Sequence, residues 1–326
     1  MKKYILIGTL FLILICLNTK AQKPSVNSVF EKDSITVVIT DSGLGGLSVL
    51  AEMAKNMRNS GYFVKINLIF ANALFNETGG YNALTNRNEK VKTFDNVLNG
   101  ISRKYNPDLI LIACNTLSTI YEETNFAKTS EIPIVGIVDI GVSEIKKKLD
   151  QNAISKVLIF GTETTIEEDS YRSQLVEQGI SNSRIVSQAC PQLQSYIENN
   201  PLGEDTEMLI MSYVDEALAK SPYPKEGIYV SLNCTHFGYS KKIWTEAFNY
   251  SNIEPLAIIN PNIQMAEILL NKKFANRFNK TEIDISVVSK VKISNESINS
   301  ISNILKEQSS ATSSALIHYQ LVFDLF

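Results

Sequence analysis

The sequence predicts an α/β protein built from two similar Rossmann-like or flavodoxin-like parallel-sheet domains that face each other across a cleft. Three observations predict this fold. Short β-branched apolar runs alternate with segments of helical periodicity, as in parallel sheets with right-handed helical crossovers. This alternation starts again near residue 150. The chain of 326 residues is also longer than one hydrophobic core usually serves.

Residues 1–21 have the layout of a secretory signal peptide. Two lysines precede an apolar run at 4–17, and a cut after Ala21 fits the pattern. A lipoprotein would need a small residue before Cys16, where Ile15 stands. The apolar run is also short for a membrane span. We therefore expect an exported, periplasmic protein without a membrane anchor once the signal is removed.

The mature chain is expected to be moderately acidic. The whole chain has a net charge of −3, and loss of three basic and no acidic residues with segment 1–21 leaves −6. Such a charge disfavours nucleic-acid binding. Cleavage leaves Cys114, Cys190 and Cys234, and an odd number of cysteines does not make a disulfide framework. At least one thiol must stay free or pair between chains.

The first domain is expected at 34–150, behind a polar leader at 22–33. Residues 34–40 are rich in β-branched side chains, and the apolar residues from Leu47 to Met57 recur at helical spacing. The unbroken apolar run at 109–113 indicates a strand buried on both faces. The elements expected after the helix at 47–57 are, in order, strand 64–70, helix 85–105, strand 109–113, strand 132–138 and helix 140–149.

The second domain is expected at 151–272 and repeats the alternation of strand and helix. Its expected elements are, in order, strand 156–160, helix 166–178, strand 184–187, helices 192–199 and 204–219, strand 227–233, a helix through Trp244, strand 256–259 and helix 263–270. Residues 273–310 are expected to close the fold, with a helix at 293–307. The apolar tail at 311–326 has no assignment.

A glycine-rich turn, Asp41-Ser42-Gly43-Leu44-Gly45-Gly46-Leu47, follows the first strand. The N–H groups of such a strand-to-helix turn can receive an anion. The turn lacks the lysine of a P-loop and the spacing of a dinucleotide fingerprint, so a tight turn that merely needs glycine is the alternative. Asp41 and Ser42 favour a ligand site, because open α/β sheets bind ligands at the carboxyl ends of their strands.

Two expected strands end at a cysteine. Cys114 follows the run at 109–113, and Cys234 follows the strand at 227–233. One such cysteine alone is most often a small buried hydrophobe. Two in equivalent places predict thiols that face each other across the cleft. A helix N-terminus beside each cysteine would lower the thiol pKa from about 8.5 towards neutrality.

Two opposed thiols can invert a carbon stereocentre without a cofactor. A thiolate on one face removes a proton, and a thiol on the other face delivers one. Asp41, at the neighbouring strand end, is expected to exchange a proton with Cys114. His236 is expected to do the same for Cys234.

These residues carry a resemblance to the cofactor-independent glutamate racemases of the aspartate/glutamate racemase superfamily, over residues 35–305. Six motifs stand in the family's order, at 41–47, 113–116, 132–136, 161–166, 190–198 and 234–236. The resemblance implies an amino-acid racemase that needs no metal, nicotinamide or pyridoxal phosphate. Its partner would be a small-molecule amino acid, with glutamate the first choice. A homodimer is compatible with the sequence.

The resemblance also implies roles for individual residues. Cys114 and Cys234 would be the catalytic acid/bases, and Asp41, Glu198 and His236 would tune them. Cys190 would be structural. The residues expected to hold the substrate are Ser42, Gly80, Tyr81, Asn115, Thr116, Thr165 and Thr235. Glu198 and Thr165 are supported by the resemblance alone.

Two features depart from the family. Its Asp-x-Ala-x-x-Pro-Tyr-Gly loop appears here as Asn72-Ala73 with Gly79-Gly80-Tyr81-Asn82, which leaves aspartate, another amino acid or a hydantoin open as substrate. An exported racemase would act on scavenged or wall-derived amino acids and not on cytoplasmic precursors. The alternatives are an exported binding protein that has lost turnover and a switchable Cys114–Cys234 disulfide, which requires bonding distance.

Overall fold

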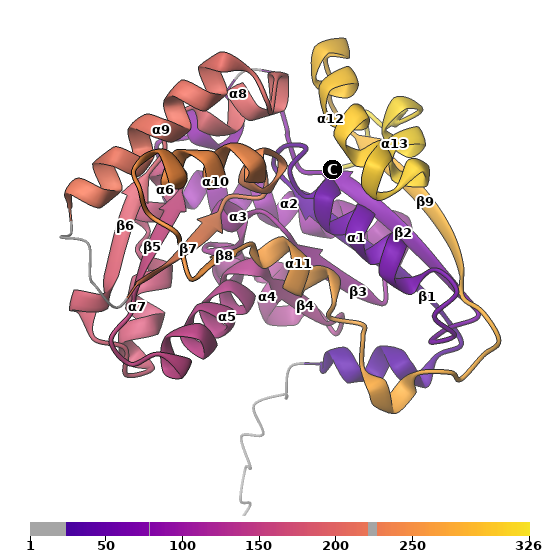
Figure 1. Cartoon of the computed structure of the whole chain (residues 1–326). Coiled ribbons are helices and arrows are strands. Elements are labelled where there is room, and N and C mark those ends of the chain that lie inside the picture. Colours follow the sequence, from indigo (N-terminus) through magenta and orange to yellow (C-terminus); the bar gives the residue numbers. More distant parts are fainter. Residues whose placement is uncertain (1–23, 78, 221–226) are drawn as a thin grey trace, which may run out of the picture.

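The computed structural model describes residues 24–77, 79–220 and 227–326. It contains two parallel sheets, with strand orders β10-β9-β2-β1-β3-β4 and β6-β5-β7-β8 (Figure 1). We call the parts built on these sheets the first and the second unit. The predicted fold class is confirmed. The predicted signal peptide at 1–21 lies outside the described residues. In the described ranges, no helix combines the length and apolarity needed to cross a membrane.

In the first sheet, β1 pairs with β2 on one side and with β3 on the other. The four strands predicted for this unit are β1 (Ser34–Asp41), β2 (Lys65–Asn72), β3 (Leu109–Ile112) and β4 (Ile134–Gly136). In register, Asp41 lies opposite Asn72, and Thr40 lies opposite Ile112. Because these strands are parallel, Asp41 and Cys114, two residues beyond β3, come to the same edge of the sheet.

The second sheet repeats this arrangement. Its strands are β5 (Lys156–Gly161), β6 (Ile185–Ala189), β7 (Ile228–Asn233) and β8 (Ala257–Ile259). Gly161 pairs with Asn233, so the turn after β5 and Cys234 after β7 lie side by side. Each unit therefore presents a cysteine at the carboxyl edge of its sheet.

Helices cover the sheets. They are α1 (Leu47–Met57), α2 (Arg87–Tyr105), α3 (Asn115–Ser118), α4 (Asn125–Thr129), α5 (Ile137–Gln151), α6 (Glu163–Glu167), α7 (Ser170–Glu177), α8 (Leu193–Asn199), α9 (Glu204–Ala219), α10 (Lys241–Tyr250), α11 (Pro261–Ala266), α12 (Asn295–Gln308) and α13 (Ser310–Ile317). The helix expected at 166–178 is broken into α6 and α7, because Asp169 has a left-handed backbone (φ 50°).

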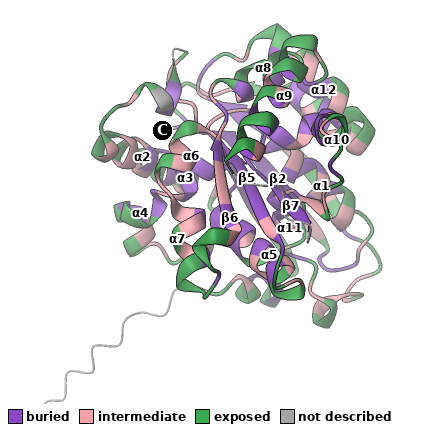
Figure 2. Ribbon diagram, turned by 60° about the vertical axis from the view of Figure 1, so that its left-hand side comes forward, coloured by how far each residue is buried: buried purple, intermediate pink, exposed green. Residues whose placement is uncertain are grey.

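The inner strands β3 and β7 are buried along their whole length, as their apolar runs predicted, and most of β1 and β5 is buried too (Figure 2). Alternate residues of β1 enter different clusters: Val37 and Ile39 pack in one, and Val38 packs with α2 in the other. All three side chains have no exposed surface. Outward helix faces remain exposed. The rigid sheet interior fixes where each strand end lies.

The segment after residue 272 differs from the sequence expectation. β9 (Glu282–Ser289) pairs with β2 along its whole length and so belongs to the first sheet. The first half of β9 alternates between more and less exposed residues, so it lacks the continuous apolar run that identified the other strands. The helix expected at 293–307 is confirmed as α12. The unassigned tail forms α13 and β10 (Gln320–Leu321), which extends the same sheet beside β9.

Leu325 anchors the tail, and its replacement tests this packing. Its side chain is 1% exposed and lies in the cluster that contains Phe94 and Ile101 of α2. We expect Leu325→Ala to lower the free energy of unfolding by about 2–4 kcal/mol, because it leaves a cavity. The measurement is urea denaturation. Phe323→Ala is the matched control, since Phe323 is 72% exposed and should change stability by less than about 0.5 kcal/mol. Equal effects would contradict the packing.

Candidate active site

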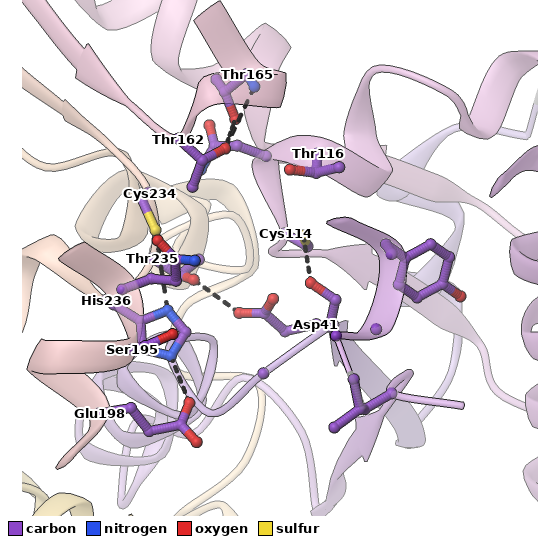
Figure 3. Close-up of a pocket in the computed structure, with 18 of the residues that line it drawn as sticks. Asp41, Cys114, Thr116, Thr162, Thr165, Ser195, Glu198, Cys234, Thr235 and His236 are labelled. Atoms are coloured by element: carbon purple, nitrogen blue, oxygen red, sulfur yellow. Dashed lines mark hydrogen bonds and ion pairs between the residues drawn. The ribbon is translucent and has the colours of Figure 1, made fainter. Parts of the chain in front are cut away.

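A cavity of about 310 Å³ lies between the two units, at the carboxyl ends of their strands (Figure 3). All twelve residues that the sequence analysis proposed for catalysis or substrate binding line it. They come from both units, as expected for a cleft between similar domains. The structure thus brings the proposed site together, and the role of each residue stays a prediction.

Cys114 contributes the thiol of the first unit. It ends the β3 segment, caps α3 and is 6% exposed. Its Sγ lies 3.1 Å from Ser42 Oγ. Burial, followed by the charge of Asp41, raises the pKa of the Cys114 thiol, against weaker opposing hydrogen bonds. The expected lowering of this pKa is therefore wrong: α3 has only four residues, and desolvation outweighs its N-terminal dipole.

Asp41 joins the two units. Its Oδ2 accepts hydrogen bonds from the Gly46 N–H, at 2.6 Å, and from Thr235 Oγ1, at 2.8 Å. Burial raises the pKa of this carboxyl, although the nearby His236 and these hydrogen bonds act in the opposite direction. Ser42 was predicted to hold the substrate, and its contact with the Cys114 thiol was not predicted.

The glycine-rich turn packs against the second unit. A Cβ atom on Gly45 would lie 2.3 Å from Thr235 Oγ1 and 2.7 Å from the backbone nitrogen of His236, so only glycine allows this approach. The turn does receive anions, but they are carboxylates of the protein. Gly46 N–H donates to Asp41, and Leu44 N–H donates to Glu198 at 3.3 Å. These two N–H groups are therefore not free to hold a ligand anion.

Cys234 contributes the thiol of the second unit. His236 Nδ1 lies 3.9 Å from its Sγ, and His236 Nε2 lies 2.8 Å from Glu198 Oε2 (Figure 3). Burial alone would lower the pKa of His236, but its contacts with Cys234 and Glu198 raise it well above its ordinary value. Burial opposes ionisation of Glu198 too, yet His236 lowers the pKa of that carboxyl. His236 and Glu198 thus form an ion pair behind Cys234.

Hydroxyl groups line the side of the cavity near α6. Thr162 caps α6, and its Oγ1 lies 2.9 Å from Thr165 Oγ1. Thr162 was not predicted for the site, although it stands in the motif that pointed to Thr165. Gln194 and Ser195, which line the cavity from α8, were not predicted either. Their spacing of four and three residues from Glu198 on one helix was the available signal.

The loop after β2, which differs from the family pattern, forms another wall of the cavity. Asn72 turns to its own neighbours: its amide donates to Ser289 Oγ at 3.3 Å, and its Oδ1 accepts from Leu74 N–H at 3.0 Å. The ring of Tyr81 packs edge-on against Phe75 of the same loop. The loop residues that line the cavity are Leu74, Asn76, Glu77, Gly79, Gly80 and Tyr81.

Fold and site together define a class of protein. Two thiols from opposite units border one small cavity, and each has a hydroxyl or imidazole partner. Such a site is suited to moving protons at the two faces of a carbon acid, which is the chemistry of racemases and epimerases.

The comparisons identify the family within this class. The family described as Asp/Glu/Hydantoin racemase matches residues 70–258, a span that contains both cysteines of the cavity. The chain belongs to this racemase family, and the recognition of a racemase from its motifs is confirmed.

Individual relatives agree with this assignment. A glutamate racemase of Clostridium botulinum is 29% identical over 213 residues, which are 65% of this chain and 75% of the relative. One from Aquifex pyrophilus is 27% identical over 205 residues, 63% of this chain and 72% of the relative. The fold is similar to that of Francisella tularensis glutamate racemase in complex with D-glutamate. The TM-score is 0.65 at 18% identity, and 89% of this chain and 97% of that chain are covered.

Glu198→Gln tests the ion pair behind Cys234. Because the pKa of His236 is raised in the folded protein, its protonation stabilises the fold. This stabilisation is complete below pH 6.5, the ordinary pKa of histidine, and is lost as pH rises through the raised pKa. The lowered pKa of Glu198 stabilises the fold above about 4.5, and this contribution is lost as pH falls through the lowered value. Urea titrations should therefore show the largest difference in unfolding free energy between wild type and variant from about pH 4.5 to 6.5.

Glu246→Gln is the control for that series. Glu246 pairs with Lys242 at 3.7 Å on an exposed face, so its loss should change stability little at any pH. A difference for Glu198→Gln that stays constant across pH would show that His236 carries no charge linked to Glu198.

Proposed function

We propose that this protein interconverts the enantiomers of an amino acid, with glutamate as the first-choice substrate, by proton transfer between Cys114 and Cys234. The observation that carries the proposal is the position of both thiols on one cavity, each from a different unit. Membership of the racemase family supports the reaction type. The relatives named glutamate racemase support the choice of substrate.

The two cysteines take complementary roles. One thiolate accepts the α-proton from one face of the substrate, and the C–H electron pair stays on the carbon. The thiol on the opposite face then gives its proton to that carbon. One cysteine ends as a thiol and the other as a thiolate, so the reverse reaction starts from the product state. Atoms and charge balance without a further reagent.

The surroundings of the thiols suggest which one begins as the acid. The raised pKa of Cys114 keeps it protonated in the resting state, so it is the proton donor. His236 Nδ1 lies 3.9 Å from Cys234 Sγ and can exchange a proton with it, so we assign Cys234 as the base. Turnover in the opposite direction begins with these roles exchanged.

Neutral donors would hold the substrate carboxylates. The cavity wall supplies hydroxyls and an amide from both units, from Ser42, Asn115, Thr116 and Thr165, whereas the Thr235 hydroxyl already donates to Asp41. Hydrogen bonds to a charged acceptor are stronger than those between neutral groups, so several such donors can bind a carboxylate without a lysine or arginine. Glu77 adds an exposed carboxylate at the loop wall. Aspartate, other amino acids and a hydantoin therefore belong in the substrate test.

Cys114→Ala and Cys234→Ala are each expected to lower racemisation by about 10³-fold or more, because each removes one acid/base group. The measurement is proton NMR in D₂O with a reductant, following the α-proton signal and the opposite enantiomer. Glutamate is tried first, then aspartate, neutral amino acids and a hydantoin. Cys190→Ala is the matched control. Cys190 is buried, and it is absent from the residues that line the cavity.

The results of these assays distinguish the candidate functions. Full activity in either cavity-cysteine variant would exclude the two-thiol mechanism. Turnover of a hydantoin but not of amino acids would keep the mechanism and change the substrate. Tight ligand binding with no deuterium at the α-carbon for any substrate would support an exported binding protein instead.

We also propose that the protein is exported to the periplasm after cleavage behind Ala21. N-terminal sequencing of the protein from fractionated cells should find Gln22 as the first residue in the periplasmic fraction. A chain that starts at Cys16 and carries lipid would instead indicate a lipoprotein. A chain that begins at Met1 in the cytoplasm would contradict export.

A further inference from the structure

The junction between α6 and α7 connects the second unit to the first. Glu168, at the end of α6, forms an ion pair with Arg87 of α2. Arg87 also bonds to Glu123 at 2.6 Å, so it is held from its own unit as well. This junction follows α6, which carries Thr165 on the cavity wall. Its position relative to the first unit therefore sets the position of that wall.

Tyr171, one turn beyond Glu168, makes the buried contact of this junction. Its hydroxyl donates a hydrogen bond of 2.6 Å to Asn115 Oδ1, and the two side chains belong to different units. Tyr171 is 3% exposed and Asn115 is 4% exposed. Tyr171 is absent from the cavity wall, whereas Asn115 lines it. Any effect of this hydroxyl on a ligand must therefore act through its neighbours.

The surrounding structure makes room for this ring. A Cβ atom on Gly141 of α5 would lie 2.7 Å from Tyr171 Cε1 and 2.8 Å from its hydroxyl oxygen. Asn233, which precedes Cys234, is fully buried beside the same hydroxyl. Neither atom of its side-chain amide has a hydrogen-bond partner of good geometry among the described residues. The Tyr171 hydroxyl thus lies between the asparagines that adjoin the two cavity cysteines.

We infer that Tyr171 is a positioning residue for substrate binding: its hydroxyl holds Asn115 Oδ1 and so turns the Asn115 NH₂ group to the cavity as a carboxylate donor. An asparagine amide offers an acceptor on one side and donors on the other. Without the hydroxyl, the amide can rotate and present its oxygen to a carboxylate, which is repulsive. This inference rests on the proposed function, because it assumes a substrate carboxylate beside Asn115.

Tyr171→Phe tests the inference by removing only the hydroxyl. We expect KM for glutamate to rise roughly tenfold with kcat changed less than about threefold, as for the loss of one hydrogen bond to a charged group. Tyr213→Phe is the matched control. Tyr213 is also buried and donates to the Pro191 carbonyl at 2.8 Å, away from the cavity wall. The Tyr213→Phe variant should show a decrease in melting temperature similar to that of Tyr171→Phe, with KM unchanged.

Asn115→Ala separates positioning from direct action. If Tyr171 acts through Asn115, the double variant Asn115→Ala, Tyr171→Phe should have the KM of Asn115→Ala alone. Additive effects of the two substitutions on KM would overturn the inference. An unchanged KM in Tyr171→Phe, with a loss of melting temperature like that of Tyr213→Phe, would also overturn it.

A spectroscopic readout keeps this test separate from the proposed function. In protein labelled with ¹⁵N-asparagine, the Asn115 side-chain NH₂ signals are identified by their absence in Asn115→Ala. They should shift and broaden in Tyr171→Phe but not in Tyr213→Phe, whether or not the protein turns over glutamate. Unchanged Asn115 signals would overturn the inference. An inactive wild type would overturn the proposed function alone.

Discussion

The site depends on the close contact between the glycine-rich turn of the first unit and Thr235-His236 of the second. Asp41 makes this contact specific, because one carboxylate oxygen binds both the turn and the Thr235 hydroxyl. Gly45 makes it possible, since any side chain there would meet Thr235 Oγ1. The contact lies at the carboxyl edges of both sheets, so it brings the ends of β3 and β7, with their cysteines, to one cavity.

The two sides of the cavity differ in charge. On the first side, burial raises the pKa of both Cys114 and Asp41 and so opposes their ionisation. On the second side, His236 and Glu198 stabilise each other as ions at 2.8 Å. A proton relay between two identical groups needs one of them protonated and the other not. The two thiols therefore lie in unequal surroundings, with Cys114 beside Ser42 and Cys234 beside the His236–Glu198 pair.

The sequence predicted the parts of the fold that depend on burial. β1, β3 and β7 were recognisable because both faces are covered, and the strand ends then followed from parallel pairing. β9 was missed because its exposed half alternates. The predicted pKa of the Cys114 thiol was wrong, because the local sequence shows the helix N-terminus but not how deeply the fold buries the thiol. Thr162, Gln194 and Ser195 were missed because their place on the cavity depends on how the two units meet.

The residue after each cysteine is bonded to the opposite unit. Thr235, which follows Cys234, donates to Asp41 of the first unit, and Asn115, which follows Cys114, accepts from Tyr171 of the second. Each hydrogen bond is buried, so breaking it leaves an unpaired polar group at a cost of about 1–3 kcal/mol. These two hydrogen bonds join the units at the residues next to the cysteines, so they fix the relative position of the two thiols directly. A reaction that needs a base and an acid on opposite faces of one carbon requires such local control, because errors of about 1 Å in placement can cost about 10²-fold in rate.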